Sequence, residues 1–118
     1  MKRGEVYWAD LRPRSGSEQQ GLRPVVVLSH DAFNESPDWK SVIVIPCTTS
    51  KAQRRRGPTV VALPEGTGGL REDCVAICHQ VTTLDRSKLG QRLGTLPEAL
   101  LRAVEDGVRA AMDLHGDT

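Results

Sequence analysis

The chain has 118 residues, of which 38% are hydrophobic and 26% charged, enough for one soluble domain with a modest core. No apolar run is long enough for a membrane helix, and the opening residues MKRGEVYWADL lack the apolar core of a signal peptide. Three cysteines are an odd number, which argues against a disulfide framework and is typical of a reducing compartment. We therefore expect one cytoplasmic domain over residues 1–118 without membrane contacts.

Short blocks of valine, isoleucine and leucine between turn-rich stretches predict several short strands. The expected strands are residues 6–11, 24–29, 41–49, 59–63 and 73–81, with a shorter one at 92–95. The block VVVL in the second strand shows no polar alternation, so this strand should be central or covered on both faces. The segment DAFNESPDWK between the second and third strands predicts a turn of helix and a loop.

The end of the chain changes to a helical period. The apolar positions that recur at intervals of three and four are Leu101, Val104, Val108 and Ala111. Thr95 and Glu98 predict a capping box with a proline in the first turn, and Gly116 predicts the end of the helix. Gly107 costs about 1 kcal/mol relative to alanine in mid-helix, which indicates close packing against another element or subunit. The elements together predict a mainly β fold with α (α+β), a small, strongly bent antiparallel sheet or barrel closed by a C-terminal helix.

Cys74, Cys78 and His79 are the residues that invite a zinc site. In a regular strand, residues four apart are separated by roughly 13 Å and adjacent side chains point to opposite faces, whereas zinc ligands lie about 2.0–2.3 Å from the metal. We therefore interpret these cysteines as core residues. The sequence also lacks the glycine-rich and histidine motifs of phosphate and metal sites, so an enzyme of this sequence should need no metal or cofactor.

Arg23 stands between a polar run and the apolar block that begins at Pro24. An arginine at the edge of a core costs free energy unless it has a partner or a task. Other polar residues near strand ends are Glu18, Gln19, Gln20, Thr48, Thr49, His79 and Gln80. These ends can converge on one groove, but plain structural roles stay open: an ion pair for Arg23, turn capping for the threonines, and a backbone hydrogen bond for Gln80.

The segment SKAQRRRG concentrates positive charge in a chain whose net charge is only +1. Its cations are Lys51, Arg54, Arg55 and Arg56. Two interpretations remain, a solvated loop and a patch that contacts phosphates.

Three segments carry a resemblance to a known family. RGEVYWADLRPRSGSEQQGLRPVVVLSHDAFN resembles the opening of the MazF/PemK/Kid family of toxin endoribonucleases. VIVIPCTTS is similar to the second motif of that family, and QVTTLDRSKLGQRLGTL with the following helix resembles the third. The likeness runs in order through nearly the whole chain.

The resemblance implies an SH3-like barrel, a homodimer, and metal-independent cleavage of single-stranded mRNA at short sequences. The products would carry 2′,3′-cyclic phosphate and 5′-hydroxyl ends. It also implies a cognate antitoxin, a small protein whose disordered acidic tail occupies the RNA groove.

The resemblance also assigns roles by position. Arg23 matches the catalytic arginine and Thr48 the catalytic threonine, while Gln80 matches a glutamine of the third motif. Ser17, Glu18 and Gln19 fall in the loop that flanks the RNA groove. Two departures matter: Thr82 stands where relatives often carry arginine, and His79 stands where several relatives carry an acidic residue.

The chemistry of RNA cleavage agrees with these assignments. The nucleophile is the 2′-hydroxyl of the substrate, so the protein must orient it, accept its proton and stabilise charge on the phosphate. A guanidinium is a rigid donor fork suited to phosphate, and Thr48 can donate to a phosphoryl oxygen or orient the 2′-hydroxyl. His79 and Glu18 are the candidate bases; because His79 and Gln80 should face opposite sides of a regular strand, only one of them is expected in the groove.

Two other classes remain as alternatives. A gyrase-poisoning toxin of the same fold needs a C-terminal Trp-Gly-Ile tip, and this chain ends in LHGDT. A non-catalytic SH3-like module for nucleic acid or peptide usually displays aromatic side chains in its groove, and this chain has few. The sequence therefore favours an endoribonuclease whose expected partners are single-stranded RNA, a cognate antitoxin and a second copy of the chain.

Overall fold

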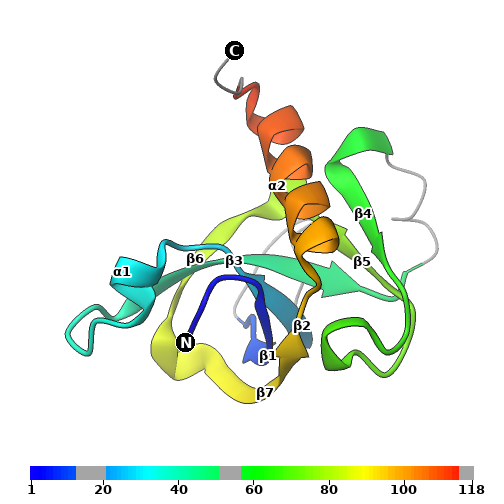
Figure 1. The fold of residues 1–118 in the computed structure, drawn as a ribbon. Coiled ribbons are helices and arrows are strands. Elements are labelled where there is room, and N and C mark those ends of the chain that lie inside the picture. Colours follow the sequence, from blue (N-terminus) through cyan, green and yellow to red (C-terminus); the bar gives the residue numbers. More distant parts are fainter. Residues whose placement is uncertain (13–20, 51–56, 115–118) are drawn as a thin grey trace.

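The computed structural model describes residues 1–12, 21–50 and 57–114. These residues form an antiparallel sheet and two α-helices (Figure 1). The strands are β1 (Glu5–Asp10), β2 (Leu22–Val27), β3 (Ser41–Thr48), β4 (Val60–Leu63), β5 (Cys74–Ile77), β6 (Thr82–Asp85) and β7 (Leu89–Thr95), and the helices are α1 (Asp31–Asn34) and α2 (Glu98–Met112). No helix among the described residues is both long and apolar enough to cross a membrane.

The sheet has seven strands in the order β4-β5-β3-β2-β1-β7, with β6 paired to β3 off this path. Every pairing is antiparallel. The long strand β3 is the centre, since its first half pairs with β6 and its last two residues pair with β5. The described strands bend around without a pairing that closes the ring. The predicted fold class, a mainly antiparallel β fold with a C-terminal helix, is confirmed.

The valine block of β2 explains how the sheet builds its core. Val25, Val26 and Val27 are fully buried, and β2 lies between β1 and β3. Val26 belongs to one apolar cluster, and Val25 and Val27 belong to a second cluster, as expected when successive side chains point to opposite faces. The prediction of a central strand covered on both faces is therefore confirmed.

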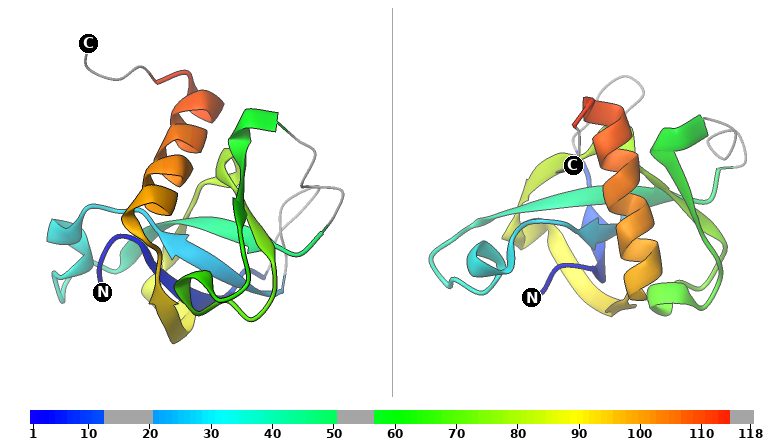
Figure 2. Two further views of the ribbon diagram at one scale, coloured as in Figure 1. Left: turned by 45° about the vertical axis from the view of Figure 1, so that its right-hand side comes forward. Right: turned by 45° about the horizontal axis from the view of Figure 1, so that its top comes forward.

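Helix α2 packs against the sheet next to β4, and both views in Figure 2 show it there. The predicted capping box is wrong, because Thr95 still belongs to β7 and its hydroxyl accepts a hydrogen bond from Arg92 (2.8 Å). Pro97 is the N-cap, so it precedes the helix rather than lying inside its first turn. The helix ends at Met112, and Asp113 adopts the left-handed conformation at its C-cap. The predicted stop, Gly116, lies outside the described residues.

Gly107 is a point of close approach between α2 and Cys78, which follows β5. A Cβ atom at this position would lie 2.6 Å from Sγ of Cys78 and 3.0 Å from its Cβ. Real Cβ atoms do not come this close, so only glycine fits without a shift. The predicted close packing at Gly107 is confirmed.

The predicted strand over 73–81 is too long. β5 ends at Ile77, a 3₁₀ turn follows over Cys78–Gln80, and the chain then starts β6, which the sequence did not predict. The turn carries Cys78 into the core beneath α2, where it is fully buried. The last strand is longer than the predicted 92–95, since β7 begins at Leu89.

Candidate active site

A pocket of about 180 Å³ lies where the ends of several strands meet. Its polar and aromatic lining comprises Trp8, Arg23, Thr48, Thr49, Arg71 and Glu72. Arg23 comes from β2 and Thr48 from the end of β3, and the register that pairs Val25 with Pro46 carries Arg23 to the level of Thr48. The structure thus brings together the two residues that match the catalytic arginine and threonine of the family motifs.

Arg23 is exposed at the mouth of this pocket. Its backbone is fixed by pairing with Ala9 of β1, and its guanidinium has no hydrogen bond or ion pair to any other described residue. The sheet therefore fixes the backbone of Arg23, while the guanidinium forms no ion pair with a carboxylate of the described residues. It is available to bind an anionic ligand.

Thr48 is almost fully buried, with a relative exposure of 6%. Its Oγ1 accepts a hydrogen bond from the backbone N–H of Ser50 at 3.1 Å. A hydroxyl has one donor and two acceptor lone pairs, so this bond leaves the hydroxyl proton of Thr48 available for a ligand. The same bond fixes the position of the oxygen.

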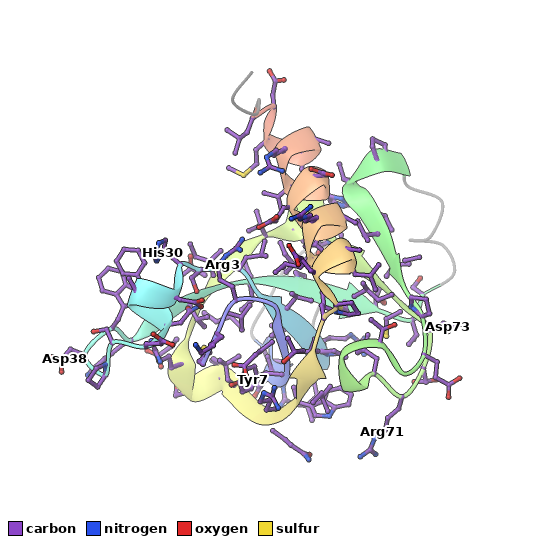
Figure 3. All side chains as sticks on the ribbon, viewed as in Figure 1. Arg3, Tyr7, His30, Asp38, Arg71 and Asp73 are labelled. Atoms are coloured by element: carbon purple, nitrogen blue, oxygen red, sulfur yellow. The ribbon has the colours of Figure 1, made fainter. Side chains whose placement is uncertain are left out.

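Arg71 and Glu72 belong to the pocket although the sequence did not single them out. They precede β5, and Figure 3 shows the Arg71 side chain extending away from the body of the protein. The glycine turn before them packs tightly on β7, because Gly69 has a φ of +77° and a Cβ there would collide with the carbonyl of Leu93. Asp73 helps to hold this turn by accepting a hydrogen bond from the N–H of Glu65 at 2.8 Å. The signal in the sequence was the charged run directly after a glycine-rich turn.

His79 and Gln80 lie elsewhere. Both are in the 3₁₀ turn that follows β5. In β5, Val75 is the residue that pairs with Thr48. His79 and Gln80 therefore lie on the order of 10 Å from Val75, further along the chain. His79 is exposed and its Nδ1 lies 2.8 Å from Oγ1 of Thr59, while Gln80 is half-buried. Neither lines the pocket. The expectation that they face opposite sides of a regular strand is wrong, because the strand has already ended.

The remaining predicted site residues belong to two segments that adjoin pocket-lining strands in the sequence. Ser17, Glu18, Gln19, Lys51, Arg54, Arg55 and Arg56 all lie outside the described residues. The first of these segments precedes β2, which carries Arg23, and the second follows β3, which ends at Thr48.

The three cysteines are buried and form no disulfide, which confirms the core interpretation. Burial raises the pKa of Cys78 to about 11 and raises that of Cys47 further, so both stay protonated at neutral pH. Metal ligation requires thiolates. Within the described part of the chain, no three histidine, cysteine or acidic side chains are placed to hold a metal ion.

Comparison with known proteins gives consistent matches over the whole chain. The model of the family described as PemK-like, MazF-like toxin of type II toxin-antitoxin system matches residues 2–112. The endoribonuclease MazF of Staphylococcus saprophyticus is 32% identical over 115 residues, which are 98% of this chain and 93% of that protein.

Solved structures of MazF-like proteins have a fold similar to that of this chain. An endoribonuclease in complex with its cognate antitoxin from mycobacterial species superposes with a TM-score of 0.79 at 26% identity and covers 99% of both chains. MazF from Deinococcus radiodurans gives a TM-score of 0.79 at 26% identity over 96% of each chain. With the family match across residues 2–112, these likenesses show that the chain belongs to the PemK-like, MazF-like toxins of type II toxin–antitoxin systems.

Proposed function

We propose that this MazF-like toxin endoribonuclease cuts single-stranded mRNA at short sequences, without a metal, by attack of the RNA's own 2′-hydroxyl on the adjacent phosphate. The bond from phosphorus to the 2′-oxygen forms, and the bond to the 5′-oxygen breaks. The products are a 2′,3′-cyclic phosphate and a 5′-hydroxyl. The observation that carries the proposal is the convergence of Arg23 and Thr48 in one pocket.

Arg23 is proposed to bind the phosphoryl oxygens. The reaction adds negative charge to these oxygens, and a preorganised donor aimed at developing charge stabilises the transition state. A guanidinium presents two parallel N–H donors in a fixed plane. Its own pKa above roughly 12 makes it a poor proton donor, so its role is electrostatic.

Thr48 is proposed to donate its hydroxyl proton to a phosphoryl oxygen. The N–H of Ser50 already occupies one of its acceptor sites, which fixes the oxygen and leaves the proton free to point at the substrate. Its position at the end of β3, at the level of Arg23, allows both residues to contact the same phosphate.

The proton acceptor is proposed to be Glu72, the carboxylate that lines the pocket. It would take the proton of the 2′-hydroxyl, and the 5′-oxygen would take a proton from solvent water as it leaves. His79, the base indicated by the sequence, is the alternative, since an RNA strand that continues along β5 would reach it. Glu18, the other base indicated by the sequence, lies outside the described residues.

The substrate would extend beyond the pocket. We propose that Gln80 and the segments containing Ser17, Glu18, Gln19, Lys51, Arg54, Arg55 and Arg56 contact further nucleotides, and that the protein acts in the cytoplasm as a homodimer. A cognate antitoxin with an acidic tail would compete for the same cationic surface. The support is that structural neighbours were solved with antitoxins, including a MazE–MazF complex from Deinococcus radiodurans.

The test is cleavage of a long single-stranded RNA by the purified protein in excess EDTA, with mapping of the cut sites and analysis of both new ends. The proposal predicts cuts at a short recurring sequence, with cyclic phosphate and 5′-hydroxyl ends. Cleavage that stops in EDTA, or products with 5′-phosphate ends, would contradict it.

A further inference from the structure

Trp8 is the aromatic side chain of the candidate pocket. It lies in β1 opposite Pro24 of β2, next to the pair formed by Ala9 and Arg23. Its ring is half-buried, and its indole N–H has no hydrogen-bond partner elsewhere in the described ranges. Trp8 and Arg23 both line this pocket.

The other aromatic residues of the chain are occupied elsewhere. The hydroxyl of Tyr7 donates to Glu5 at 3.2 Å, and Tyr7 packs on the other apolar cluster. Phe33 and Trp39 stack on each other with ring centroids 4.6 Å apart. The segment that carries this pair is at the opposite side of the molecule from Arg71, as the labels of His30 and Asp38 in Figure 3 show.

The pocket is small and combines apolar surface with hydrogen-bond donors. Its volume of about 180 Å³ is below the roughly 300–1,000 Å³ of pockets for drug-sized ligands. Trp8, Leu22, Pro24 and Leu93 supply apolar surface, while Arg23 and Thr48 supply donors. Flat apolar surface beside phosphate donors is what a nucleobase and its phosphate require, since single-stranded RNA is bound by stacking unstacked bases on aromatic rings.

We propose that Trp8 is the stacking platform for the base of a nucleotide adjoining the cleaved bond, and that this stacking positions the scissile phosphate against Arg23 and Thr48. The inference rests on the proposed function for the identity of the reaction, but it is a statement about base binding. Trp8 acts as a positioning residue, because it holds the base while other groups contact the phosphate.

The first experiment uses fluorescence. In a Trp39→Phe background, Trp8 is the remaining tryptophan of the two in the chain. Titration with a mixed-sequence single-stranded 2′-deoxy oligonucleotide, which lacks the attacking hydroxyl, should quench its emission in a saturable way. Unchanged emission at concentrations where a labelled oligonucleotide is bound by anisotropy would overturn the inference.

The second experiment couples the residue to one base. Oligonucleotides with the mapped cleavage sequence receive a single abasic site at each position in turn, and binding is measured for the wild type, Trp8→Leu and Trp8→Phe. Trp8→Leu should weaken binding of the intact strand about 5- to 150-fold, and Trp8→Phe should restore most of it. The abasic site that weakens wild-type binding by a similar factor should have no further effect on Trp8→Leu.

Controls separate this coupling from a structural role. Trp39→Leu, outside the pocket, should leave binding and every abasic effect unchanged. Equal abasic effects in wild type and Trp8→Leu would overturn the stacking inference, even if Arg23-dependent cleavage is found. Quenching of Trp8 by the deoxy oligonucleotide in a protein that does not cut RNA would support the base site while contradicting the proposed function.

Discussion

Arg23 has the two properties that a phosphate clamp needs, a backbone fixed in the sheet and a guanidinium without a partner among the described residues. Arg23→Ala should therefore lower the cleavage rate by at least about 10² while the fold is retained, because one preorganised donor contributes roughly 10²–10³. Arg23→Lys should recover little, since a lysine lacks the planar fork. The measurement is single-turnover cleavage with circular dichroism on each variant. Turnover of the alanine variant near the wild-type rate would remove Arg23 from the mechanism.

The proton acceptor is identified by comparing two variants in single-turnover cleavage. With Glu72 as the base, Glu72→Gln should lower the rate by about 10²–10⁴, because general base catalysis contributes a factor of that size, while His79→Asn should leave the rate unchanged. A loss of that size in His79→Asn, with Glu72→Gln near the wild-type rate, would instead assign the base to His79.

The sequence predicted that Arg23 and Thr48 could lie near each other because they stand at the ends of apolar blocks, and the structure places both in the lining of one pocket. Trp8, Arg71 and Glu72 were missed as site residues because their place depends on the register between β1 and β2 and on a glycine turn that packs on β7. His79 was considered for the groove because residues 73–81 were predicted to form one strand, which would place His79 near the end of that strand. The 3₁₀ turn at Cys78–Gln80 is set by packing under α2, which no local pattern reveals.

At the scale of elements, the contact of α2 with the turn after β5 depends on the missing side chain at Gly107. In Gly107→Ala, overpacking should cost about 1–3 kcal/mol and the better helix propensity should return about 1 kcal/mol, so the free energy of unfolding should fall by up to about 2 kcal/mol. Denaturant unfolding at a fixed protein concentration measures this. Adding Cys78→Ala removes the sulfur that lies 2.6 Å from the new Cβ. The loss of unfolding free energy in the double variant should therefore be smaller than the sum of the losses in the two single variants. Strict additivity would show that the two positions do not collide.

Long, uniform patterns predicted elements well, and short or interrupted ones did not. The predictions of a central strand at β2 and of a helix at α2 were correct. A strand buried on both faces has a continuous apolar run, and a helix buried along one stripe has apolar residues at intervals of three and four. β6 was missed because TTLD has a single buried residue, Leu84, and its pairing with β3 is long-range. The capping box failed because β7 extends through Thr95 to pair with Glu5 of β1, so tertiary pairing overrode a local cap.

At the scale of the molecule, residues 13–20 lie between β1 and β2, which carry Trp8 and Arg23, and residues 51–56 follow β3, which ends at Thr48. The basic segment is predicted to follow the RNA backbone, with each cation neutralising at most one phosphate. Binding to single strands weakens with salt at a log–log slope near −0.7 per contacted phosphate. Replacing Arg54, Arg55 and Arg56 with glutamine should therefore flatten the slope by up to about 2 units, with cleavage-site preference retained because phosphate contacts do not read sequence. A wild-type slope in the triple variant would show that these arginines do not contact RNA and would leave antitoxin binding to be tested.

The central claim is that the substrate supplies the nucleophile and the pocket of Arg23 and Thr48 supplies the charge stabilisation. The most direct measurement uses an RNA with one mapped cleavage site and replaces only the 2′-hydroxyl next to the cleaved phosphate with hydrogen. The account predicts that this strand still binds with nearly the affinity of the unmodified RNA and is not cut at that bond, while unmodified sites in the same strand are cut normally. Cleavage of the deoxy linkage at the wild-type rate would show that another nucleophile attacks the phosphate and would contradict the account.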